Sequence, residues 1–89
     1  MKLTGSQLSE LVIVVASQEY GREVFRRRPL MLAVERRIKE IGKWSVRDDS
    51  LSQSRGAKSF GLANIDWAIS RLGKDGRLIR LGHDRWRLP

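Results

Sequence analysis

Three side chains in the last third of the chain have types and spacing that suit recognition of flat, polar surfaces. Asn64, Trp67 and Arg71 are spaced i, i+3 and i+7, so in a helix they share one side. An Asn amide suits paired hydrogen bonds to adenine and an Arg guanidinium to guanine, each good pair giving about 1 to 3 kcal/mol of discrimination. The spacing therefore predicts contacts to base edges.

Trp67 has two interpretations. Its ring can pack under the following hairpin or against residues 43–59 as part of a second small core. Alternatively, it can contact the methyl group of thymine or of a modified base.

The sequence offers little catalytic or metal-binding chemistry. The chain has no Cys and one His, and the adjacent carboxylates Asp48 and Asp49 lack the Glu and Lys partners of metal-dependent nucleases. We expect His83 to be an exposed turn residue, with a phosphate or base-edge contact as the alternative. Gly73 and Gly76 follow a helix, whereas phosphate-binding glycines precede one. The sequence thus predicts a binding protein without metal or cofactor, and not an enzyme.

Charge and length limit the partner and the architecture. Lys and Arg number 18 against 10 Asp and Glu, a formal net charge of +8, which indicates an anionic partner such as nucleic acid. The 89 residues are 40% hydrophobic and predict a single domain over residues 1–89. The longest apolar run, residues 11–16, is far shorter than the roughly 18 residues that span a bilayer. With no signal-peptide pattern, we expect a cytoplasmic protein without a membrane partner.

The helix predicted over residues 60–74 has two chemically distinct faces. Its apolar residues recur at helical spacing and form a buried face: Gly61, Leu62, Ile65, Ala68, Ile69 and Leu72. The opposite direction carries aromatic, basic and small polar groups: Trp67 and Lys74, flanked by Phe60, Asn64 and Arg71 on one side and by Ala63 and Ser70 on the other.

A short basic hairpin follows, with strands over residues 77–81 and 85–88 joined by Gly82-His83-Asp84. Alternation predicts that Trp86 and Leu88 face inward, as do Ile79 and Leu81. The outward face then carries a basic strip that is either solvated or in contact with a phosphate backbone or minor groove: Arg80, Arg85 and Arg87.

The first half of the chain predicts two further helices. The Thr4-x-x-Gln7 spacing of a capping box begins a helix over residues 5–18. Ile13 and Val14 widen its apolar surface, which indicates either a central core helix or contact with a partner. Residues 22–25 suit a strand, and Pro29 begins a helix over residues 29–42. The preceding residues 26–28 are all Arg and need phosphates or carboxylates beside the electropositive helix end.

Residues 43–59 are rich in Ser, Arg, Asp and Gly and predict a mobile basic loop. Ser45-x-x-Asp48 can cap one short helical turn, and Trp44 is expected in the core. The loop delivers Arg55 and Lys58 to the start of the third helix, where they either track a phosphate backbone or belong to a plain connector.

The end of the chain also carries a family resemblance. The pattern is Asn64-x-x-Trp67-Ala68-x-x-x-Leu72-x-x-x-Gly76-x-Leu78-Ile79, closed by Trp86-x-Leu88. This run, with the Ser/Gly-containing loop at residues 54–56, resembles the N-terminal winged-helix domain of Mrr-type restriction endonucleases. The first 50 residues match in pattern only. The resemblance implies a module that binds double-stranded DNA and directs a nuclease, fused or associated, and related winged helices read modified bases.

We therefore expect an α+β winged helix-turn-helix of three helices and a hairpin wing. The expected function is binding of double-stranded DNA as the target recognition domain of a restriction-type system, and whether a methylated base is read stays open. Two alternatives stay open: a stand-alone transcriptional regulator and a protein-interaction winged helix. The residues expected at the interface are Asn64, Trp67, Arg71, Lys74, Arg55, Lys58, Phe60, Ser70, Arg80, Arg85 and Arg87.

Overall fold

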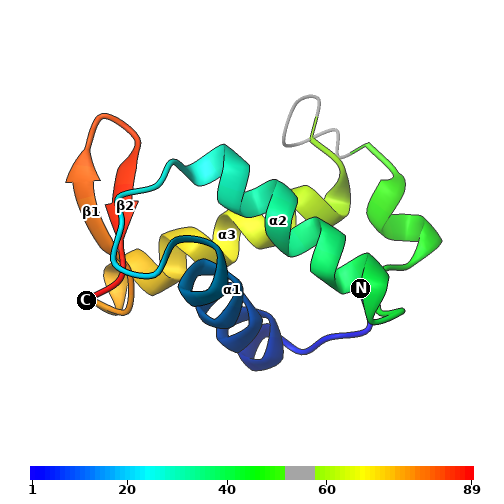
Figure 1. Cartoon of the computed structure of the whole chain (residues 1–89). Helices are drawn as coiled ribbons and strands as arrows, with labels where there is room; N and C mark the ends of the chain where they lie inside the picture. The colour runs from blue at the N-terminus through cyan, green and yellow to red at the C-terminus, as the bar shows by residue number, and fades with distance from the viewer. Residues whose placement is uncertain (52–57) are drawn as a thin grey trace.

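The part of the chain that the structure describes folds into three α-helices, a short 3-10 helix and a two-stranded antiparallel hairpin, an α+β arrangement. A computed structural model describes residues 1–51 and 58–89 (Figure 1). In chain order the elements are α1 (Gly5–Tyr20), α2 (Arg27–Glu40), the short 3-10 helix η1 (Val46–Asp49), α3 (Phe60–Lys74), β1 (Ile79–Gly82) and β2 (Arg85–Arg87). The α3 bounds agree with the prediction, α1 ends two residues later, and α2 begins and ends two residues earlier.

Local signals set the starts of α1 and η1 as predicted, whereas α2 begins at Arg27 and not at the predicted Pro29. The Thr4 hydroxyl oxygen accepts the Gln7 N–H at 3.1 Å, and the Gln7 side chain accepts the Thr4 N–H at 2.9 Å, which completes the capping box. Ser45 and Asp48 form the same motif at η1. Gly42 lies just beyond α2 at φ 71°, a conformation that glycine adopts without steric cost.

The core is made by all three helices together with the hairpin. In α3 the residues Ile65, Ile69 and Leu72 are at most 1% exposed, so its predicted apolar face is buried. They pack with apolar side chains from the rest of the chain: Leu8, Val12 and Val15 of α1, Leu30, Val34 and Ile38 of α2, and Phe25, Leu78 and Trp86. Trp44 is half-buried against this core, and it covers Gly61 so closely that an added Cβ would lie 2.1 Å from the ring.

The strand predicted over residues 22–25 is reduced to a single residue. Phe25 exchanges two backbone hydrogen bonds with Trp86, each 2.8 Å long, whereas the preceding Val24 is half exposed. The longer strand is wrong because Glu23 N–H bonds to the Tyr20 carbonyl and turns the chain there. The pairing of Phe25 with Trp86 places the hairpin beside the segment that enters α2 (Figure 1).

The hairpin register differs from simple alternation. Arg80 pairs with Trp86, so both side chains lie on the same face of the hairpin, and a bulge follows between Arg80 and Gly82. The prediction that Leu81 faces inward is wrong, because Leu81 is 46% exposed. Arg80 is exposed, as predicted, but it shares the face of Trp86, and its guanidinium lies over that ring. The predicted strip of three arginines is therefore divided between two faces.

The outer surface of α1 stays partly uncovered. Ile13 is half-buried against the core, whereas Val14 is 44% exposed. Ile13 thus fits the interpretation of α1 as a central core helix. Val14 is exposed and available for contact with a partner.

We predict that Ile69→Ala lowers the free energy of unfolding by about 2 to 5 kcal/mol, because truncation leaves a cavity at a fully buried position. Urea denaturation measures this loss. The control is Val46→Ala, where the side chain is 89% exposed and a change within about 0.5 kcal/mol is expected. Equal effects of the two substitutions would contradict the orientation of α3.

Candidate nucleic-acid interface

The outward side of α3 presents the predicted polar and aromatic groups. Asn64, Arg71 and Lys74 are exposed, and Trp67 is 51% exposed although it is a large hydrophobic residue. These four side chains follow the i, i+3, i+7, i+10 spacing of one helix side. Ala63, which the sequence places on the flank of this face, is instead buried.

The Trp67 ring stands free of the protein core. The guanidinium carbon of Arg71 lies 5.7 Å from the centre of the ring, within the range of a cation–π contact. The exposed fraction of Trp67 does not fit the interpretation in which it packs into a second small core. Its ring is available as a contact surface.

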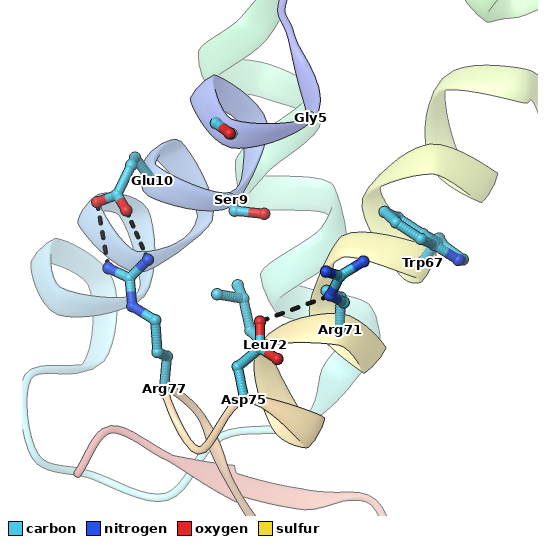
Figure 2. Close-up of a pocket in the computed structure, with 9 residues that line it drawn as sticks. Gly5, Ser9, Glu10, Trp67, Arg71, Leu72, Asp75 and Arg77 are labelled. Carbon is cyan, nitrogen blue, oxygen red and sulfur yellow. Dashed lines mark hydrogen bonds and ion pairs between the residues drawn. The ribbon is translucent and has the colours of Figure 1, made fainter.

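A cleft of about 340 Å³ separates α3 from α1, and we call it the α1-side cleft (Figure 2). Across it, the Arg77 guanidinium donates to both carboxylate oxygens of Glu10, at 2.5 and 3.2 Å, and the pKa of Glu10 is lowered by this hydrogen bond and charge. Arg71 lies between Trp67 and Asp75, with its Nε 3.6 Å from the Asp75 carboxylate. Each of these two cations therefore has an acidic partner.

On the other side of α3, a second cleft of about 340 Å³ lies against the hairpin. We call it the hairpin-side cleft, and it is lined by Arg27, Ser70, Gly73, Lys74, Arg80 and Trp86.

Arg27 joins α2, α3 and the hairpin beside this cleft. Its guanidinium donates to the Asp66 carboxylate at 2.8 Å and to the Ser70 hydroxyl at 3.2 Å, and it lies 4.8 Å from the centre of the Trp86 ring. Its backbone N–H donates to the Asp84 carboxylate at 3.2 Å. One of the three arginines at the start of α2 thus meets carboxylates, as the sequence requires.

The turn of the hairpin also contributes to the contacts of Arg27. His83 and Asp84 have φ values of 49° and 59°, an uncommon conformation for residues other than glycine that two-residue hairpin turns require. The turn brings the Asp84 carboxylate to the backbone of Arg27 and leaves His83 exposed, as expected.

Asp66 lies between two cations. Lys58 Nζ is 2.8 Å from one carboxylate oxygen and Arg27 is 2.8 Å from the other. Burial alone would raise the pKa of Asp66, but the hydrogen bonds and charges of Lys58 and Arg27 outweigh it and lower that pKa below its ordinary value of 3.8. The positive charge of Lys58 is therefore partly neutralised by Asp66.

Several predicted interface residues have other roles or positions. Ser70 accepts from Arg27, Phe60 is half-buried with Arg47 above its ring, and the Arg87 guanidinium donates to the Leu88 carbonyl. Arg85 is exposed on the hairpin, and Arg55 lies outside the described residues. The sequence analysis missed Arg27 and Asp66 as a pair, because nothing local indicates a contact across 39 positions.

None of the helices in residues 1–51 and 58–89 has the length and apolar character needed to cross a membrane. Within those same ranges, no group of three or more His, Asp or Glu side chains is placed to hold a metal ion. No protein-family model, curated protein or solved structure matches this chain significantly.

We predict that the stability lost in Asp66→Asn depends on pH. Because the folded-state pKa of Asp66 is lowered, its charged form stabilises the fold above its ordinary pKa, and that contribution disappears as the pH falls through the folded-state value. The difference in unfolding free energy between parent and variant should thus shrink from about pH 6 to about pH 3 in urea denaturation. A constant difference would contradict this role.

We predict stability losses of different size for two tryptophans. Trp86 is 3% exposed, so Trp86→Ala should cost about 3 to 5 kcal/mol, whereas Trp67→Ala should cost less than about 1 kcal/mol. Thermal and urea unfolding of both variants provide the comparison. A similar loss in both would restore the interpretation of Trp67 as a core residue.

Proposed function

We propose that this chain is a winged-helix module that binds double-stranded DNA, with α3 in the major groove and the hairpin as the wing. The observation that carries the proposal is an exposed stripe of polar and aromatic side chains on α3: Asn64, Trp67, Arg71 and Lys74. Their amide, indole, guanidinium and ammonium groups lie opposite the apolar residues of the buried face. A major groove about 12 Å wide admits one helix. A recognition helix needs such a polar outward side on a packed scaffold.

The charge distribution supports an anionic ligand of this kind. The chain carries a net charge of +8, and several of its carboxylates already pair with cations of the same chain, including Glu10 and Asp66. Phosphate contacts provide the sequence-independent part of DNA affinity, whereas base contacts provide specificity. Lys74 at the end of the stripe and the exposed hairpin residues Arg80 and Arg85 suit the first role. Asn64 and Arg71 suit the second.

The resemblance to the N-terminal domain of Mrr-type endonucleases supports a narrower version of the proposal. In that version the module selects target DNA for a restriction-type nuclease, and Trp67 contacts the methyl group of thymine or of a modified base. The exposed indole is compatible with this contact.

A protein-interaction role is the second candidate. It is favoured by an open apolar hollow between α1 and the end of α2, where Val14 and Ile41 are 44% and 48% exposed beside Leu3 and Leu11. Binding to duplex DNA and its salt dependence separate the two candidates, because protein contacts through apolar residues do not release counterions.

We predict that the parent protein binds short duplexes and that the logarithm of its affinity falls linearly with the logarithm of salt concentration. Fluorescence anisotropy with methylated and unmethylated duplex pools measures both quantities.

Asn64→Ala and Arg71→Ala should relax base preference by about 1 to 3 kcal/mol, and Trp67→Ala should remove a preference of about 1 kcal/mol for one methylation state.

The matched control is Arg36→Ala, which removes an exposed cation from α2. It should leave base preference unchanged. Binding without salt dependence, or no duplex binding, would reject the proposed function. Unchanged base preference in all three α3 variants would reject α3 as the reading helix.

A further inference from the structure

The two clefts that flank α3 have different charge balances. In the α1-side cleft, Arg77 pairs with Glu10 and Arg71 with Asp75, so two cations face two carboxylates. The described residues that line the hairpin-side cleft include three cations and no carboxylate: Arg27, Lys74 and Arg80. Arg27 is bonded to Asp66. The positive charge of this cleft thus comes from Lys74 and Arg80.

Trp86 holds Arg80 toward this cleft. The two residues are cross-strand partners, and the guanidinium carbon of Arg80 lies 5.9 Å from the centre of the Trp86 ring. The ring itself is 3% exposed and is packed against α3 so tightly that a Cβ on Gly73 would lie 3.0 Å from it. A cation stacked on a fixed ring loses less side-chain freedom when it binds a ligand.

The donors around the cleft suit a phosphate group. Lys74 offers an ammonium with three donors, and Arg80 offers a planar fork that matches two phosphate oxygens. The Ser70 oxygen accepts from Arg27, which leaves its own O–H available to donate.

We propose that the hairpin-side cleft seats one backbone phosphate of bound duplex DNA between Lys74 and Arg80, and that the α1-side cleft seats none. This inference rests on the proposed function and adds an orientation to it. One DNA strand then passes along the junction of α3 and the hairpin, and α1 lies on the side of α3 away from that phosphate.

The first test measures the salt dependence of binding. The double variant Lys74→Ala/Arg80→Ala should lower the slope of log affinity against log salt by about 1, because one phosphate is no longer neutralised and its counterion is no longer released. The matched control, Arg77→Gln, removes a cation from the α1-side cleft and should leave the slope unchanged. Melting curves of all variants verify that they fold. An unchanged slope in the double variant, or an equal fall in the control, overturns the proposal.

The second test locates the phosphate. A set of duplexes, each with one neutral methylphosphonate linkage, is titrated with parent protein and with the double variant. At one linkage, neutralisation should weaken binding of the parent and have no further effect on the variant, because both changes remove the same contact. If neutralisation weakens binding of the parent and of the double variant equally at every linkage, the two changes do not share a contact and the proposal is overturned.

The outcomes distinguish this inference from the proposed function. A parent protein that binds no duplex overturns both. Duplex binding that does not depend on Lys74 and Arg80 overturns only the phosphate seat. If inorganic phosphate at matched ionic strength raises the melting temperature of the parent but not of the variant, while duplex binding is the same in both, the cleft takes a free anion and the proposal fails.

Discussion

The arrangement of α3 and the hairpin depends on one side chain, Arg27. Its guanidinium bonds to Asp66 and Ser70 of α3 and stacks on Trp86 of β2, and its backbone N–H bonds to Asp84 in the hairpin turn. An arginine fork can make these contacts together because its donors are planar and fixed in direction. One residue in the first turn of α2 therefore sets how α3 and the hairpin lie relative to each other.

The contacts of Arg27 separate it from its two neighbouring arginines. A helix beginning with three arginines and no acidic residue in its first turn would be disfavoured by its own dipole. The carboxylates of Asp66 and Asp84 offset that cost for Arg27, whereas Arg26 and Arg28 stay exposed. Positive charge at the start of α2 is thus divided between one cation that holds the fold together and two that face solvent.

The residues proposed for the interface also differ in how rigidly they are held. Trp67 and Arg71 stand on a helix whose opposite face is fully buried, so their backbone positions are fixed by the core. Lys74 is a flexible side chain near the end of the same helix, and Arg80 gains order from Trp86. Rigid groups suit base reading, and a charged pair beside a groove suits a phosphate, which needs less exact placement.

The sequence by itself determined the elements with a periodic or local cause: the capping boxes, the bounds of α3 within a residue, and the apolar side formed by Ile65, Ile69 and Leu72. Helical spacing and caps depend on neighbours three or four positions away, which one sequence displays. The tertiary structure alone decided the exposure of Trp67, the partners of Arg27 and the direction of Arg80. These depend on contacts between distant positions and on strand register, where a single bulge moves a side chain to the other face.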